Sequence, residues 1–193
     1  TTASNNTAVG YASLAANTTG TANVAVGKDA MIANTTGGTN VAMGADALTA
    51  NTTGSSNTAL GQASLEANTT ASFNTGVGRN ALGLNTTGAN NTALGYNSLV
   101  ANTTGAYNTA LGKSAGGAVT TGTNNTIIGG NTGDALTDAD DNVAVGTSAL
   151  GTDTLGSKSV AIGASALHTQ NFTSATDTYN TAVGYYAGVA VTT

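Results

Sequence analysis

A five-residue phrase, Asn-Thr/Val-Ala-aliphatic-Gly, recurs eleven times along this chain of 193 residues, with small variations. The first ten copies begin 17 residues apart, and the last begins four residues late at Asn180. A fixed short period over a whole chain predicts a stack of near-identical units, each contacting mainly its neighbours. The copies begin at Asn6, Asn23, Asn40, Asn57, Asn74, Asn91, Asn108, Asn125, Asn142, Ser159 and Asn180.

The repeat unit, numbered from this Asn as its first position, has the consensus N-T-A-Φ-G-x-x-[A/S]-L-x-A-N-T-T-G-x-x, where Φ is aliphatic. Side chains alternate across a strand, so the second and fourth positions share one face and the third-position Ala takes the other. We expect the fourth-position aliphatic to be enclosed and the Ala column to form a flat outer strip that another copy of the chain can approach closely. The fourth-position residues are Val9, Val26, Met43, Leu60, Val77, Leu94, Leu111, Ile128, Val145, Ile162 and Val183.

Glycine closes every copy of the phrase, and since only Gly adopts positive φ without steric cost, a turn is predicted there. A second apolar column, mostly Leu at the ninth position, predicts a second strand, and the polar NTTG segment predicts a second turn. Two short strands and two turns describe one coil of an all-β solenoid, a parallel β-roll of about eleven coils. The closing glycines are Gly10, Gly27, Gly44, Gly61, Gly78, Gly95, Gly112, Gly129, Gly146, Gly163 and Gly184.

Composition narrows the function classes. Four basic residues against nine acidic ones leave no basic nucleic-acid footprint, and there is no Cys for a thiolate metal site. No apolar stretch approaches the ~20 residues of a membrane helix, so we expect no membrane insertion by this segment. A thin roll buries little apolar area. We therefore expect a homo-oligomer with cyclic symmetry. The chain begins with Thr1 rather than Met, which suggests a processed product or a fragment.

The phrase resembles the head repeat of YadA-like trimeric autotransporter adhesins, most closely in SVAIG at Ser159–Gly163. The full unit, as in NTALGYNSLVANTTGAY at Asn91–Tyr107, is also similar to repeats of phage tail-fibre proteins. The resemblance implies a left-handed parallel β-roll with three chains around one axis. It also implies an extracellular adhesive or structural role, at a cell surface or on a virion tail fibre, with a receptor or glycan as partner. The unit here is longer than the usual head repeat, around NTTG.

Several smaller motifs have a functional and a structural interpretation. The paired Thr of NTTG could form an ice-binding array, or their hydroxyls could satisfy nearby backbone groups. Each N-T-T is also an N-glycosylation sequon. The acidic residues of TDADDN at Thr137–Asn142 could bind calcium but lack the spacing of a calcium loop. His168 has no partner His or Cys for a metal site. We predict no enzyme activity, no metal and no cofactor.

The sequence predicts one repeat domain over 1–193, with regular coils over about 6–167, an irregular insertion over 168–179 and a last coil over 180–193. The insertion carries Phe172 and Tyr179, which we consider a possible surface-contact loop because loops on rigid scaffolds often bind partners. A harmless insertion or a terminal cap is equally compatible. The function predicted is a fibre segment that spaces or presents a binding surface. Alternatives are a self-assembling filament subunit, an ice-binding solenoid and a polysaccharide-cleaving tailspike, for which no paired carboxylates are supplied.

Overall fold

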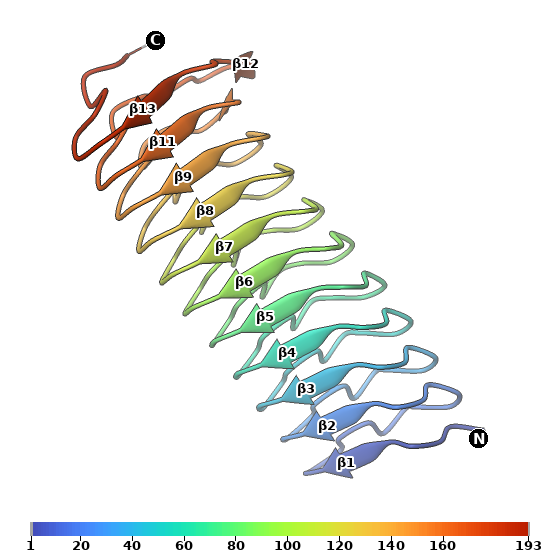
Figure 1. The fold of residues 1–193 in the computed structure, drawn as a ribbon. Helices are drawn as coiled ribbons and strands as arrows, with labels where there is room; N and C mark the ends of the chain where they lie inside the picture. The colour runs from blue at the N-terminus through green and yellow to red at the C-terminus, as the bar shows by residue number, and fades with distance from the viewer. Residues whose placement is uncertain (1, 193) are drawn as a thin grey trace.

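The protein is a β-solenoid in a computed structural model that describes residues 2–192. Successive coils stack along one axis, so that their strands form a single ladder with the two chain ends at opposite ends of the rod (Figure 1). All strand pairs are parallel, and residues 2–192 contain no helix. The predicted all-β stack with a 17-residue period is confirmed.

An eleven-stranded sheet runs the length of the rod, and a two-stranded sheet lies beside its C-terminal part. The large sheet contains one three-residue strand from each coil. Its strands are β1 (Thr7–Val9), β2 (Val24–Val26), β3 (Val41–Met43), β4 (Thr58–Leu60), β5 (Thr75–Val77), β6 (Thr92–Leu94), β7 (Thr109–Leu111), β8 (Thr126–Ile128), β9 (Val143–Val145), β11 (Val160–Ile162) and β13 (Thr181–Val183). The small sheet pairs β10 (Gly156–Ser157) with β12 (Thr176–Asp177).

The register of the large sheet pairs each repeat position with the same position in the next coil. Ala25 pairs with Ala42, and Ala42 pairs with Ala59, one coil further on. Backbone bonds extend this ladder beyond the strands: Leu48 N donates to the Ser64 carbonyl oxygen at 3.0 Å. The NTTG segments are linked in the same way, by bonds between corresponding Thr residues of neighbouring coils. Identical units can therefore stack without any change in side-chain environment.

The two faces of each strand are oriented opposite to the prediction. The third-position Ala points inward and is fully buried in most coils, whereas the second and fourth positions point outward. Met43, for example, is 46% exposed while its neighbour Ala42 is 0% exposed. The interior is small because one 17-residue coil must hold both this side chain and the ninth-position Leu. Ala is the side chain that fits beside that Leu, and larger aliphatics take the outer face.

The second strand that we predicted around the ninth position is absent from residues 2–192, although its Leu column is buried as expected. Leu48, Leu65, Leu82 and Leu99 all adopt φ between 49° and 54°. Left-handed backbone is uncommon for residues other than Gly and interrupts an extended strand. The chain therefore bends around each Leu instead of running straight, and this bend turns the side chain into the core.

The core composition changes in two adjacent coils without loss of packing. Gly116 and Gly133 replace the ninth-position Leu, while Ile127 replaces the third-position Ala between them. A Cβ on Gly116 would lie 2.9 Å from Ile127 Cδ1 and 3.0 Å from Leu99 Cδ2. Val119 and Leu136 also become apolar core residues in these coils. The larger Ile and the new aliphatics thus fill the volume that the missing Leu side chains leave.

The predicted phrase-closing turns are confirmed, since all eleven of these glycines have φ between 125° and 139°. A Cβ on Gly61 would also lie 2.6 Å from the Gly78 carbonyl oxygen of the next coil. The glycine of NTTG is required for a different reason. A Cβ on Gly37 would approach the Gly54 carbonyl oxygen to 2.3 Å, so close contact between coils, not positive φ, selects Gly there.

Candidate interaction surface

The outward side chains of the large sheet form one continuous surface, which we call the apolar face. It consists of the second-position column of Thr and Val and the fourth-position column of Val, Leu, Ile and Met. No charged residue occurs in either column. Large side chains are substantially exposed on it, including Leu94 at 44% and Leu111 at 41%. Contiguous exposed apolar surface of this kind marks interaction sites in proteins.

The sequence did contain a signal for this orientation. The third position is almost always Ala, with one Gly and one Ile, whereas the fourth position varies from Val to Met. A confined interior restricts side-chain volume, while an outer surface tolerates different sizes. Size uniformity within the repeats, rather than hydrophobicity, identifies the inward position.

Two columns of exposed residues border the apolar face. We name the column of residues directly before each copy of the phrase, the seventeenth position of a regular unit, the leading rim. The sixth-position column, directly after the closing Gly, is the trailing rim. The leading rim contains Phe73, Tyr107, Lys158 and Tyr179, and the trailing rim contains Tyr11, Lys28, Arg79, Tyr96, Lys113 and Tyr185. All four basic residues and most aromatic residues of the chain are therefore on these rims.

Contacts along the rims involve some of these residues. The guanidinium of Arg79 lies 5.9 Å from the ring centroid of Tyr96, one coil further along the trailing rim. Lys28 Nζ forms an ion pair with Asp29 at 2.6 Å.

The asparagines of the NTT sequons are core residues. Asn34, Asn51, Asn68, Asn85 and Asn102 are fully buried. Asn34 Nδ2 donates to Asn17 Oδ1 at 2.9 Å and to the Gly37 carbonyl oxygen at 3.0 Å. A glycan attached to these amides would prevent the coil from closing, so the folded chain offers no acceptor at the buried sequons.

The two Thr residues of NTTG have different environments. The first hydroxyl bonds to the neighbouring coil, as when Thr52 Oγ1 donates to the Thr69 carbonyl oxygen at 3.1 Å. The second Thr is exposed, as at Thr53. Only one of the two hydroxyls therefore faces solvent freely, and the backbone-satisfying interpretation applies to the first.

The acidic segment TDADDN lies along the surface next to the preceding coil. Asp140 Oδ1 accepts hydrogen bonds from the amide and hydroxyl of Thr123 at 2.6 and 2.9 Å, and Asp138 accepts one from the Thr121 hydroxyl. His168 Nδ1 contacts the Ser148 carbonyl oxygen at 3.0 Å. Residues 2–192 contain no group of three or more side chains arranged for a metal ion and no pocket.

The irregular insertion separates the two aromatic residues that we singled out. Tyr179 is 69% exposed on the leading rim, whereas Phe172 is half-buried and its backbone amide donates to Asp153 Oδ1 at 2.9 Å. Asp153 is a fully buried carboxylate whose other oxygen accepts from Gln170 Nε2 at 2.5 Å. These bonds hold the insertion to the last coils.

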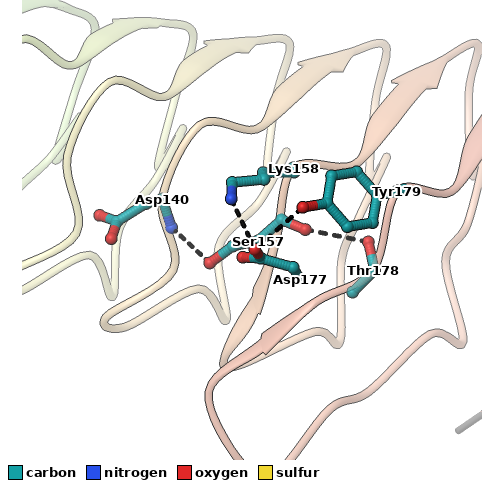
Figure 2. A network of polar contacts seen from close by, with 6 residues as sticks. All are labelled: Asp140, Ser157, Lys158, Asp177, Thr178 and Tyr179. Atoms are coloured by element: carbon teal, nitrogen blue, oxygen red, sulfur yellow. Dashed lines mark hydrogen bonds and ion pairs between the residues drawn. The ribbon is translucent and has the colours of Figure 1, made fainter.

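Figure 2 shows the polar network at this end of the leading rim. Lys158 Nζ lies 2.5 Å from Asp177 Oδ2, and the hydroxyl of Tyr179 donates to the same oxygen at 3.1 Å. The hydrogen bond from Lys158 lowers the pKa of the Asp177 carboxyl, and the same contact raises the pKa of Lys158. Lys158 Nζ also lies 5.4 Å from the centroid of the Tyr179 ring. Tyr179 is therefore an exposed aromatic side chain that contacts both Lys158 and Asp177.

Comparison with family models, with curated proteins and with solved structures finds no match to this chain. Among residues 2–192, there is also no helix with the length and apolarity to cross a membrane.

Proposed function

We propose that this chain is a structural segment of an extracellular fibre, at a cell surface or on a virion tail, in which three copies associate through their apolar faces. The apolar face carries the proposal. It runs along the whole ladder, contains no charge, and exposes large aliphatic side chains that a solitary rod would leave in water. Removal of such area from water stabilises an assembly by roughly 25 cal/mol per Å².

A second copy of this chain is the occupant that fits this face. A partner covering the full ladder needs side chains at the same axial interval, one set per ~4.8 Å strand spacing. Another copy of the same solenoid supplies that interval at every level, and two uncharged faces meet without desolvating an ion. The resemblance to YadA-like head repeats implies three copies. It also implies that the chain winds as a left-handed solenoid, and we include this handedness in the proposal.

In this proposal the rod spaces or presents a region that contacts a receptor or glycan. The insertion is the candidate for that region, because Tyr179 is exposed and contacts Lys158 and Asp177 where the regular coil is interrupted. Rigid, exposed aromatic side chains supply contact area at low entropic cost.

The test is the mass of the particle in solution, measured by light scattering after size-exclusion chromatography. Three chains per particle supports the fibre proposal, and a single chain at micromolar concentration contradicts it. Particles that grow without limit would favour the filament alternative, in which open coil ends join end to end.

Ice binding is a second candidate, favoured by one observation. Thr58, Thr75, Thr92, Thr109 and Thr126 occupy the second position in five consecutive strands and lie on the outer face of a regular sheet. A monomer that produces thermal hysteresis would support this function in place of the fibre, since both uses require the same face.

A further inference from the structure

Two strands of the large sheet have an aromatic residue on the leading rim and a cation on the trailing rim at the same level. Phe73 and Arg79 border β5, and Tyr107 and Lys113 border β7. Within the regular coils these are the only aromatics on the leading rim, and each is followed six residues later by a cation. Phe73 and Tyr107 are 62% and 63% exposed.

Neither aromatic can contact its level-matched cation within one chain. Five residues that include an extended strand lie between them, and at ~3.3 Å per residue this separates their Cα atoms by roughly 15–20 Å. Lys113 has neither an ion pair nor an aromatic contact in the described part of its own chain. Arg79 lies 5.9 Å from the ring centroid of Tyr96 in its own chain. Lys28, whose level lacks an aromatic, is paired with Asp29.

A uniform apolar face cannot by itself fix how copies align along the rod. Sliding one copy by a whole coil places similar aliphatic side chains opposite one another again, so the slipped and unslipped assemblies bury similar area. Register is weakly specified in such repetitive surfaces unless particular side chains distinguish one level from the next. The rims are where this chain differs from coil to coil.

We infer that Phe73 and Tyr107 of one copy receive Arg79 and Lys113 of its neighbour as intersubunit cation–π contacts that set the axial register. The inference rests on the proposed association through the apolar face. When copies are related by rotation about an axis parallel to the rod, the end of each strand approaches the start of the neighbouring copy's strand at the same level. Trailing and leading rims then meet, and a cation within about 6 Å of a ring is attracted to it.

Zero axial offset is the one alignment that forms both contacts at once. A slip of one coil would set Phe73 against Gln62 or Tyr96 and Tyr107 against Tyr96 or Gly130, which removes both contacts. An antiparallel arrangement would remove them as well, because it brings leading rim to leading rim and trailing rim to trailing rim. The rims therefore specify parallel, unstaggered copies, and the apolar face supplies the attraction.

The direct test is a double-substitution cycle on the assembly, using Tyr107→Ala, Lys113→Ala and the pair combined. Each single change should raise the dissociation constant of the trimer by roughly tenfold or more. Each contact contributes at least about a twofold factor to that constant, and a trimer contains three such contacts, whose factors multiply. In the Tyr107→Ala background, Lys113→Ala should have no further effect. The unmatched combination Tyr107→Ala with Arg79→Ala should instead show multiplied effects.

Crosslinking tests independently which coils of neighbouring copies lie opposite each other. The chain has no Cys, so Tyr107→Cys/Lys113→Cys with a short bis-maleimide should yield covalent trimers on a denaturing gel. The control Tyr107→Cys/Thr147→Cys moves the trailing-rim thiol by two coils, roughly 10 Å, and should yield monomers. Phe73→Cys/Arg79→Cys repeats the test at β5, should the first variant misfold.

The outcomes separate the two proposals. A trimeric mass with crosslinks only at matched levels, and a coupled cycle, supports the rim contacts. A trimeric mass with equal crosslinking of the offset pair, or with an additive matched cycle, overturns the rim contacts and leaves the fibre proposal intact. A monomeric wild-type chain overturns both.

Discussion

Asn51 donates from its side-chain Nδ2 to Asn34 Oδ1, one coil earlier, at 2.8 Å, and also to the Gly54 carbonyl oxygen of its own coil at 2.9 Å. The first bond ties neighbouring coils together, and the second closes the NTTG turn. The ladder that these bonds form ends at Asn102, where Val119 takes the corresponding place and Asn102 Oδ1 has no hydrogen-bond partner. A second column of Asn lies at the first position of the repeat. There the side-chain oxygen accepts from the backbone of the next coil, as when Asn57 N donates to Asn40 Oδ1 at 2.9 Å.

Replacing Asn51 by Ala should lower the free energy of unfolding by about 2–4 kcal/mol, because it leaves Asn34 Oδ1 buried without its donor and also opens a cavity. The control is Thr53→Ala in the same turn, whose side chain is exposed and which should change stability by no more than about 0.5 kcal/mol. Chemical denaturation followed by circular dichroism measures both. Equal effects for the two variants would contradict the structural role of the ladder.

Placing charge on the apolar face should dissociate the assembly without unfolding the chain. In Leu94→Asp/Leu111→Asp, two carboxylates per chain would have to be desolvated at the interface, which costs several kcal/mol per buried ion. Thr87→Asp/Thr104→Asp adds the same charge to an exposed column away from the face and should leave the mass unchanged. Light scattering and circular dichroism on both variants distinguish dissociation from unfolding, and loss of structure in the first variant would place these leucines in the core instead.

The closing glycines should be sensitive to a single methyl group. Gly61→Ala forces a side chain onto φ of 133° and puts its Cβ 2.6 Å from the Gly78 carbonyl oxygen, so we expect a loss of about 2 kcal/mol or more. Gly130→Ala is the matched control, since a Cβ there meets nothing within 4 Å. Thermal unfolding compares the two, and a neutral Gly61→Ala would show that the coils can move apart at little cost.

The altered core of the two coils that begin at Asn108 and Asn125 contains substitutions that should compensate one another. Gly116→Leu alone overpacks the interior against Ile127 and Leu99, with an expected loss of about 1–3 kcal/mol. Adding Ile127→Ala and Val119→Asn restores the consensus coil and should recover much of that stability. Unfolding midpoints of the single and triple variants test this expectation, and simple additivity would argue against compensation.

Acid titration should report the Lys158–Asp177 contact. The Asp177 pKa lies below its ordinary value of 3.8 chiefly because Lys158 donates to it, so the pair contributes stability above that value and loses it as pH falls through the lowered pKa. Carboxyl NMR titration should show the Asp177 pKa rising towards 3.8 in Lys158→Met. The contact is on the surface, so its contribution should also weaken in high salt.

The period of 17 residues, the parallel stack and the closing turns were all predictable from the sequence. Each follows from a local rule that applies in all eleven repeats. Gly is needed where the backbone has positive φ, and side chains alternate between the two faces of a strand. The left-handed backbone at Leu48 and its counterparts was not predictable in this way, because Leu has no intrinsic preference for that conformation. Leu48 is buried in one hydrophobic cluster with Ala47, Ala59 and other Leu residues of the column. Burial in this cluster stabilises the conformation, and the cluster exists only in the assembled coil.

The apolar face was likewise only partly predictable from the sequence. Alternation in Thr58-Ala59-Leu60 establishes that two faces exist, yet hydrophobicity alone assigned the larger side chain to the interior, and that assignment was wrong. Tertiary structure decided the matter through volume, since the space beside a stacked Leu column admits Ala and excludes a second Leu. The sequence by itself determined the coil and its repetition. Only the closed coil decided which side of the strand faces inward, and thereby left a continuous aliphatic surface on the outside of the rod.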